Sequence, residues 1–296
     1  RTNNEDLSFR SSVLQDTGPG KKFDASVDSV LGVQGSARLT GQLDLTVQAV
    51  SRKGSEDSYA PQVTWSFLRY QALPDLAIRI GRTRTPFFMF SDALNLNYIT
   101  PWVRPPIEVY SLNPFSNVDG VDALYRFTAG PLDVEVQGTY GNSRLSIHGG
   151  SAKLHDIRSI NFAATGDGLT LRASYMTSGV DIVWGEGLGK GLLDALVETG
   201  YGNIADQLSG TGGKASFSSV GFQFDKYNWL VIGEYARREI NRFTSSAHGW
   251  YLTTGYRIGN VTPYLTYARQ METSPATPST VPIPPLAAGI ELFNAS

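Results

Sequence analysis

The sequence has no cysteine and only three histidines, His148, His155 and His248. The lack of cysteine excludes disulfide bonds, thiolate zinc sites and cysteine nucleophiles, and so few histidines leave little for imidazole chemistry. The 25 lysines and arginines are balanced by 27 acidic residues, so the chain lacks the overall basic charge that would hold nucleic acid. No apolar run reaches about 18 residues, and the first residues lack the apolar core of a signal peptide. We therefore expect no transmembrane helix, and a chain that is either cytosolic or already processed.

Glycine and aromatic residues, by contrast, are abundant. The 296 residues include 31 Gly, 14 Tyr, 14 Phe and 5 Trp, and 41% are hydrophobic. A chain this apolar, with balanced charge, is not disordered. Its apolar residues rarely recur at helical spacing, and its aromatic and threonine content is typical of strands. The composition therefore predicts an all-β fold.

Apolar and polar residues alternate in thirteen segments, each of which predicts a strand with one apolar face. The clearest are 43–48 and 132–140, and the weakest is 5–13. The others are 28–39, 61–72, 76–84, 119–128, 156–165, 169–179, 215–226, 228–240, 248–259 and 261–270. Most are longer than the roughly five or six residues of a globular strand and match the roughly 9–11 that cross a bilayer at a tilt.

The connections between these segments alternate between tight turns and long loops. The tight turns, rich in Gly, Pro, Asn and Asp, are 40–42, 73–75, 129–131, 166–168, 226–228 and 259–260. The longer connections are 14–27, 54–60, 85–118, 142–155, 180–214, 241–247 and 271–286. This alternation is typical of a transmembrane antiparallel up-and-down β-barrel. The alternative is a soluble all-β enzyme or lectin, which the long insertions at 85–118 and 180–214 disfavour.

Three stretches carry a resemblance to a known family. Residues 80–88 read Ile-Gly-Arg-Thr-Arg-Thr-Pro-Phe-Phe, residues 98–110 are rich in Pro, Tyr and Trp, and residues 119–122 read Asp-Gly-Val-Asp. Together they resemble the bacterial outer-membrane porins, in particular the porin-like proteins of Gram-negative proteobacteria. The resemblance implies a barrel in the outer membrane, in contact with lipids and lipopolysaccharide, and commonly trimeric. It also implies a third loop, 85–118, folded into the lumen, and passive diffusion of small hydrophilic solutes and ions without catalytic residues or cofactors.

The end of the chain departs from that family. Porins usually finish on a strand that closes with an aromatic residue, whereas here a proline-rich loop is followed by Phe293 and three more residues. A further strand at 287–296 would make fourteen. Because an unpaired barrel edge in lipid is not viable, we expect one domain over 1–296 with sixteen strands in all, the last ones missing; fourteen is the alternative.

Arginine dominates the basic residues, and rings of charged side chains set ion selectivity in pores. We predict that the constriction is formed by Arg38, Arg79, Arg82, Arg84, Arg104, Arg126, Asp92, Glu108, Asp119 and Asp122. A basic excess there predicts a weak anion preference. An inward position for Arg82 and Arg84 requires a bulge near Gly81. The alternative for each arginine is an ion pair that stiffens the wall.

Other functions remain open at this point. The same parts could form a selective channel for an anionic nutrient such as a carboxylate, sulfonate or phosphate. A barrel enzyme would depend on His248, the one plausible base, beside Ser245 and Ser246. A plugged barrel would serve as an adhesin or anchor. The glycine-rich stretch 185–191 departs from a phosphate-binding loop, and leucines recurring at helical spacing from Leu188 predict a short amphipathic helix.

Overall fold

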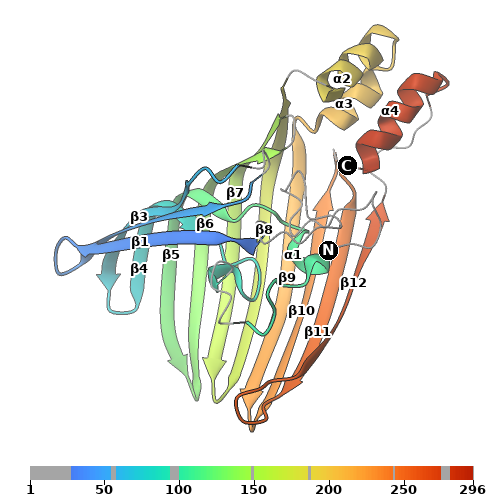
Figure 1. Cartoon of the computed structure of the whole chain (residues 1–296). Coiled ribbons are helices and arrows are strands. Elements are labelled where there is room, and N and C mark those ends of the chain that lie inside the picture. Colours follow the sequence, from blue (N-terminus) through green and yellow to red (C-terminus); the bar gives the residue numbers. More distant parts are fainter. Residues whose placement is uncertain are drawn as a thin grey trace.

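The computed structural model describes residues 28–54, 58–93, 100–147, 150–185, 188–242, 244–274 and 281–295. Its main element is one antiparallel sheet of twelve strands, in which each strand pairs with the next along the chain (Figure 1). The strands are β1 (Val30–Arg38), β2 (Leu43–Arg52), β3 (Gln62–Leu73), β4 (Leu76–Arg84), β5 (Asn117–Ala129), β6 (Leu132–Ile147), β7 (Gly150–Gly166), β8 (Leu169–Trp184), β9 (Gly213–Lys226), β10 (Trp229–Ile240), β11 (Ser246–Tyr256) and β12 (Tyr264–Ser274). The helical elements are η2 (Ser91–Ala93), α1 (Ile107–Tyr110), α2 (Leu188–Glu198), α3 (Gly202–Ser209) and α4 (Pro284–Ala295).

Twelve of the thirteen predicted strands correspond to these twelve, with ends shifted by up to seven residues, and the weak segment 5–13 lies outside the described residues. The six tight turns also fall where expected, at one end of the hairpins. The connection predicted at 142–155 is wrong, because β6 and β7 continue as a ladder in which Ser143 pairs with Leu154 and Ile147 with Gly150. In this part of β6 and β7, polar residues alternate with apolar residues such as Ala152 and Leu154, which are buried.

The C-terminal segment is helical, so the strand predicted at 287–296 is wrong. In α4, Ile290 is fully buried against a small core that includes Leu196 of α2 and Leu208 of α3. Apolar positions at helical spacing gain more from that core than from joining a sheet edge. The amphipathic helix predicted from Leu188 is confirmed as α2. Within the described residues β1 and β12 each pair on one side only, so barrel closure and a total of sixteen strands stay predictions.

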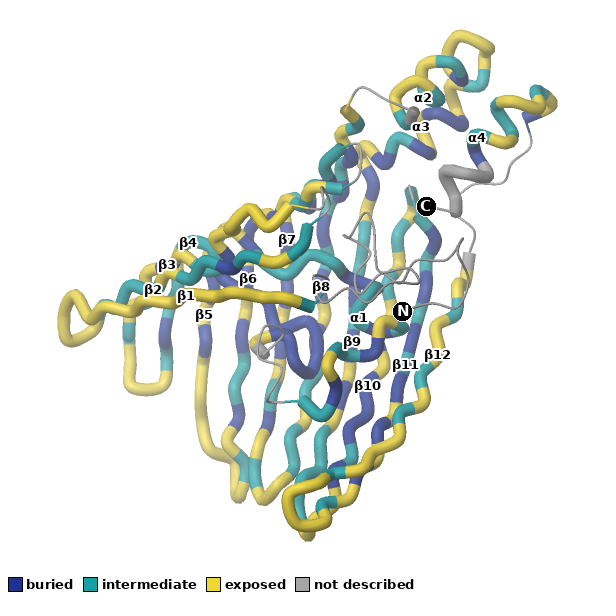
Figure 2. Tube along the Cα trace, in the orientation of Figure 1, coloured by how far each residue is buried: buried dark blue, intermediate teal, exposed yellow. Residues whose placement is uncertain are grey.

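Buried and exposed residues alternate along several strands (Figure 2), and the two faces of the sheet differ in the side chains they carry. One face, here called the outer face, exposes large apolar side chains along its length: Val121, Tyr125, Tyr140, Ile160, Phe162, Tyr175, Val220, Phe222, Tyr235 and Leu252. The other, the inner face, buries polar ones: Asp122, Gln137, Thr139, Ser159, Asn161, Ser174, Ser219, Glu234 and Thr253. A water-soluble protein has the reverse distribution. The apolar positions of the alternating sequence pattern therefore lie on an exposed face of the sheet.

Three glycines let neighbouring strands approach closely where the loop after β4 begins. Gly81, Gly120 and Gly141 are cross-strand partners in β4, β5 and β6. A Cβ at Gly120 would lie 2.1 Å from the Tyr140 carbonyl oxygen, and Gly81 has a φ of 130°. Only glycine fits these backbone positions without strain. Among the described residues, no helix is both long and apolar enough to span a membrane.

Candidate functional site

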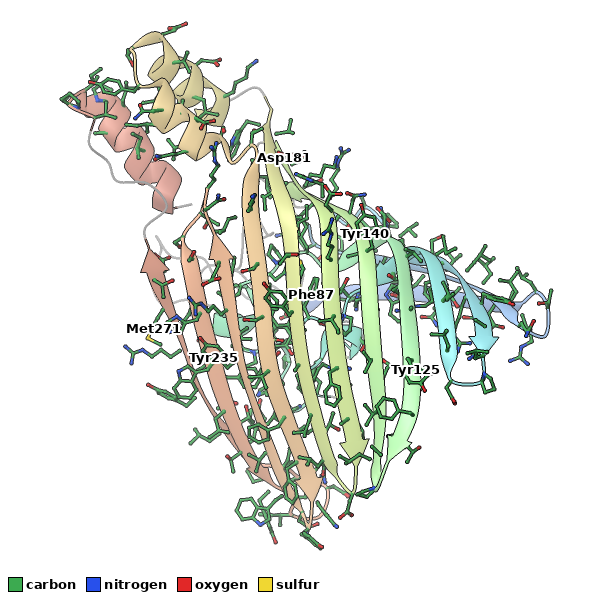
Figure 3. The ribbon with its side chains drawn as sticks, turned by 180° about the vertical axis from the view of Figure 1, so that it is seen from behind. Phe87, Tyr125, Tyr140, Asp181, Tyr235 and Met271 are labelled. Carbon is green, nitrogen blue, oxygen red and sulfur yellow. The ribbon has the colours of Figure 1, made fainter. Side chains whose placement is uncertain are left out.

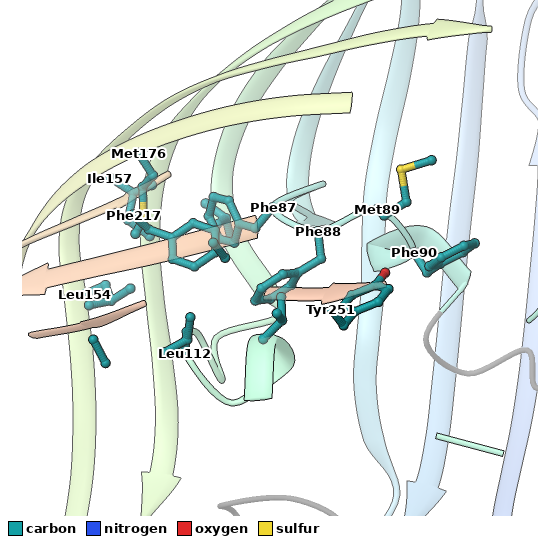
Figure 4. Close-up of a cluster of buried hydrophobic side chains, with 14 of the residues drawn as sticks. Phe87, Phe88, Met89, Phe90, Leu112, Leu154, Ile157, Met176, Phe217 and Tyr251 are labelled. Atoms are coloured by element: carbon teal, nitrogen blue, oxygen red, sulfur yellow. The ribbon is translucent and has the colours of Figure 1, made fainter. Parts of the chain in front are cut away.

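The connection between β4 and β5 lies against the inner face, where its aromatic residues form the largest buried cluster (Figure 4). Phe87 and Phe88 pack on the Phe217 ring of β9, with ring centroids 5.8 and 5.1 Å away. Met176 of β8 and Tyr251 of β11 belong to the same cluster. We call residues 85–93 and 100–116 the inner loop. Burial of four consecutive apolar residues, 87–90, holds its first part against β8–β11.

Polar side chains of the wall satisfy the backbone of the inner loop. The Ser174 hydroxyl donates to the Phe87 carbonyl oxygen at 2.9 Å, and Ser219 donates to the same oxygen. Arg172 Nη1 donates to the Phe88 carbonyl oxygen at 3.3 Å. A loop without regular structure carries backbone groups that need partners when buried, and the wall supplies them.

Glu234 of β10 is the centre of this attachment. Its Oε1 accepts a hydrogen bond from the Met89 amide at 2.8 Å, and its Oε2 accepts one from the Tyr251 hydroxyl at 3.0 Å. The side chain is buried, at 4% exposure. Beside it the Tyr110 hydroxyl accepts a hydrogen bond from the Phe90 amide at 3.1 Å. Burial raises the pKa of the Tyr110 phenol well above its usual value, so this group is a neutral hydrogen-bonding partner.

The second half of the inner loop is anchored on β11 and β12. Trp102 Nε1 donates to the Thr253 and Thr266 hydroxyls at 3.1 and 3.0 Å. Helix α1 then passes directly over Gly249 of β11, where a Cβ would lie 2.1 Å from the Glu108 carbonyl oxygen. The strand therefore needs glycine at 249 for the helix to lie this close.

The predicted charged residues occur mainly as ion pairs between neighbouring strands. Arg79 binds Asp122 through two hydrogen bonds, of 2.8 and 2.9 Å, and the Asp122 side chain has no exposure to solvent. Gln137 of β6 donates to the same carboxylate at 3.2 Å. Since Asp122 and Gln137 are buried polar residues of the inner face, this pair belongs to the interior wall. Its bidentate geometry fixes β4 against β5.

Arg82 and Asp119 form a second bidentate pair, with both hydrogen bonds at 2.7 Å. The register of β4 with β3 and β5 runs through Gly81 without a shift. The bulge that an inward Arg82 requires is therefore absent there. By strand alternation Arg82 shares the face of Ile80, which is 63% exposed. We correct the expectation accordingly: this pair lies on the opposite face from Arg79.

The remaining predicted residues do not converge on one ring. Arg38 contacts Asp44 at 3.4 Å beside the β1–β2 hairpin, and its side chain is 79% exposed. The other pairs are Arg126 with Glu135 at 2.6 Å, Arg104 with Asp28, and Asp92 with Arg172 at 3.2 Å. Glu108 makes no ion pair with a described residue and meets the wall through its backbone. Most of the predicted arginines thus form ion pairs that stiffen the wall, which was the alternative to a ring of charges at a constriction.

Arg84 differs from the others: it is the last residue of β4, and although strand alternation would place it with Arg82, its side chain contacts the inner loop. It is 6% exposed, its Nη1 donates to the Ser91 carbonyl oxygen at 3.1 Å, and its guanidinium lies 5.8 Å from the centre of the Trp65 ring. Its Nε has no hydrogen-bond partner, and no carboxylate of a described residue lies within ion-pair distance. Arg52 of β2 is near enough to repel it, and Asp92 of the inner loop is near enough to attract it without forming an ion pair. The start of the inner loop therefore carries a positive charge without a direct carboxylate partner among the described residues.

Sequence reasoning missed the residues that hold the loop, above all Glu234, Tyr251 and Ser219. The available signal was an acidic residue inside the apolar run Leu-Val-Ile-Gly-Glu-Tyr-Ala at 230–236. A carboxylate in such a run needs buried partners. Which partners those are depends on contacts between positions far apart in the chain.

The catalytic arrangement weighed for His248 is not assembled. Its ring packs on Tyr235, 6.0 Å between centroids, which is exposed on the outer face. The Ser246 hydroxyl instead bonds the backbone of Ile240. In the described part of the chain, no group of three or more His, Asp or Glu residues could hold a metal ion.

Comparison with known proteins gives structural likenesses only. No family model and no curated protein sequence matches the chain. Among solved structures, the chain resembles the outer membrane channel DcaP of Acinetobacter baumannii, at 12% identity and a TM-score of 0.49, over 87% of this chain and 71% of that one. It resembles a trimer form of the outer membrane protein OmpT of Vibrio cholerae, at 11% and 0.36, over 83% and 81%. A refined porin structure matches at 10% and 0.32, over 81% and 86%. At these identities and scores the likeness carries no argument about function.

Proposed function

We propose that the protein is a passive diffusion channel that carries small hydrophilic solutes and ions across the bacterial outer membrane. The observation that carries the proposal is the distribution of side chains over the two faces of the sheet. Large apolar residues are exposed on the outer face while polar and charged ones are buried on the inner face. A transmembrane β-barrel has this inverted pattern, because lipid contacts its outside and water its interior.

Aromatic residues on the outer face support a membrane position. Trp229 and Tyr256 form an edge-to-face pair near the tight hairpins, with ring centroids 5.0 Å apart. Six residues further along the same strands, Tyr235 and Trp250 are again cross-strand partners. At about 3.3 Å per residue the two levels are roughly 20 Å apart along the strands. Aromatic girdles flank a lipid-facing band of about 25 Å in outer-membrane barrels.

The proposed pore lies between the inner loop and the inner face of β1–β7. The loop fills the space along β8–β11 with apolar side chains, so water would pass on the other side. The wall there carries Arg69, Gln71 and the Arg79–Asp122 pair. The proposal includes three further points. Additional strands close the barrel, the protein assembles as a trimer, and its outer face contacts lipopolysaccharide.

A weak anion preference is the finer part of the proposal, and Arg84 supports it. Most other arginines of the described chain form an ion pair with a carboxylate on a neighbouring strand or in the loop, whereas Arg84 forms none with a described residue. Charged groups at a constriction set ion selectivity. The same residue would serve the alternative, a channel selective for an anionic nutrient. Such a channel would show saturating flux of that nutrient, whereas a diffusion pore would not.

Single-channel recording of the detergent-folded protein in a planar lipid bilayer tests the function. We expect stepwise conductance, in multiples of three if the protein is a trimer, and a reversal potential in a potassium chloride gradient that favours chloride. A clear cation preference would contradict the selectivity. A correctly folded protein that inserts without conducting would contradict the channel and favour an anchor or adhesin.

A further inference from the structure

The outer face has an open groove of about 610 Å³ between β4 and β8. Its origin is a row of cross-strand neighbours in which two small residues, Ala123 and Gly138, lie between Ile78 on one side and Ile160 and Tyr175 on the other. The missing side chains leave a hollow lined by the larger ones. Figure 3 shows this face, with Tyr140 above the row and Tyr125 below it.

One end of the groove is basic. Arg158 of β7 lines it, is exposed, and lies across from Tyr140 and Thr177 on the same face. No carboxylate of a described residue lies within ion-pair distance of Arg158, although Asp156 is near enough to attract it. Arg144 and Lys153 face each other further along β6 and β7.

The acidic residues at this end have other partners. Asp156 accepts hydrogen bonds from the Tyr140 hydroxyl at 3.0 Å and from His155 Nδ1 at 2.9 Å. Asp181 accepts one from the Gly212 amide at 2.9 Å, and His155 Nε2 lies 3.5 Å from it. The three cations therefore outnumber the two carboxylates. The groove combines an apolar floor with a positive end.

This combination suits a membrane lipid with an anionic headgroup. An exposed arginine on a lipid-facing surface is costly near the bilayer centre and is tolerated at the headgroup level, where it meets phosphate. Tyr140 and Tyr175 are aromatic residues of the kind found at that level. Basic pockets beside apolar membrane surfaces bind phosphate headgroups, and the volume is within the roughly 300–1,000 Å³ of ligand sites.

We infer that this groove binds an acyl chain of a phosphate-bearing membrane lipid, with Arg158 at the phosphate. The inference relies on the outer face being in lipid, as in the proposed function, but not on conduction. A second copy of the chain fits less well, because the groove carries an arginine that a protein partner would have to neutralise.

Native mass spectrometry of the detergent-folded protein with added phosphatidylglycerol tests the site. Gly138→Leu places a side chain in the groove, and its Cβ meets nothing within 4 Å. We expect lipid retention about tenfold weaker, as for the loss of roughly two buried methylene groups. Arg158→Gln should weaken retention about fivefold for phosphatidylglycerol, the effect of one arginine near an anionic surface, and hardly at all for diacylglycerol.

Arg237→Gln is the matched control, since Arg237 lies across from His248 on the same face outside the groove and already pairs with Glu239. It should retain lipid like the wild type. Circular dichroism checks folding, and Ala123→Leu replaces Gly138→Leu if that variant does not fold. Undiminished lipid retention in the filled-groove variants would overturn the inference. It would also be overturned if the wild type bound no lipid and the filled-groove variants lost only their oligomers, because the groove would then be a contact between copies of the chain. If the protein conducts no current but still retains lipid in a way that depends on Arg158, the result would contradict the proposed function and leave this inference standing.

Discussion

At the scale of single residues, the charges of this protein mainly hold the wall and the inner loop in place. Arg79 and Asp122 are satisfied by each other within the sheet, and Glu234 binds a backbone amide 145 positions earlier in the chain. Such groups are costly to bury without partners and bond strongly with them. Most charged groups of the inner face that the structure describes are therefore paired, whereas Arg84 and Arg238 form no ion pair with a described carboxylate.

The two bidentate arginine–aspartate pairs differ in burial, which predicts different contributions to stability. Asp122→Ala leaves Arg79, 18% exposed, without its carboxylate, and should cost about 3 kcal/mol. Asp119→Ala breaks the Arg82 pair, whose side chains are 39% and 51% exposed, and should cost less than about 1 kcal/mol. Urea unfolding of the two variants in lipid vesicles measures both. Equal losses would show that burial does not distinguish the pairs.

On the proposed function, Arg84 carries the anion preference of the pore. Arg84→Gln removes a positive charge at the start of the inner loop that forms no ion pair with a described carboxylate, so the reversal potential should shift towards cations. Arg237→Gln, on the outer face, should leave the reversal potential unchanged. An unaltered potential in the Arg84 variant would assign selectivity to other residues.

At the scale of elements, the inner loop is a folded unit seated on the sheet. Its aromatic residues form the main core and its backbone bonds the wall through Ser174, Arg172 and Glu234 (Figure 4). Loops without regular structure need such partners to stay ordered when buried. The seat also depends on close approach, since α1 lies over Gly249.

Gly249→Ala tests that seat. Its Cβ would lie 2.1 Å from the Glu108 carbonyl oxygen, so α1 must move away from β11. Overpacking of this kind costs about 1–3 kcal/mol, and single-channel conductance should fall because α1 moves from β11 towards the proposed pore. Gly35→Ala in β1, where a Cβ meets nothing within 4 Å, is the matched control. Unchanged stability and conductance at position 249 would mean that the helix does not need this contact.

The strands could be predicted from sequence because each leaves its own local signal, the alternation of apolar and polar residues. The same signal failed at 142–155, where the ladder continues, and at 287–296, where apolar residues serve a helical core. The ion pairs and the contacts of Glu234 could not be predicted, because they depend on register and on how the loop folds back. The bulge expected at Gly81 is such a case: the residue provides a φ of 130° without shifting register.

At the scale of the whole molecule, the inverted distribution of side chains is the feature on which the proposed function rests. Exposed aliphatic and aromatic residues cover the outer face, and two levels of aromatic residues lie on it (Figure 3). In water such a surface would aggregate, whereas in a bilayer it is the stable one. On the proposed function, the inner face is the side that water reaches.

Thiol labelling tests this orientation most directly, and a chain without native cysteine suits it. Leu68 and Arg69 are neighbours on β3; Leu68 is 43% exposed on the outer face, and the Arg69 side chain, 31% exposed, contacts Asp44. In lipid vesicles, Arg69→Cys should react with a charged, membrane-impermeant thiol reagent, and Leu68→Cys should react at least about tenfold more slowly because lipid covers it. Equal labelling of the two cysteines, or faster labelling at position 68, would contradict a membrane channel.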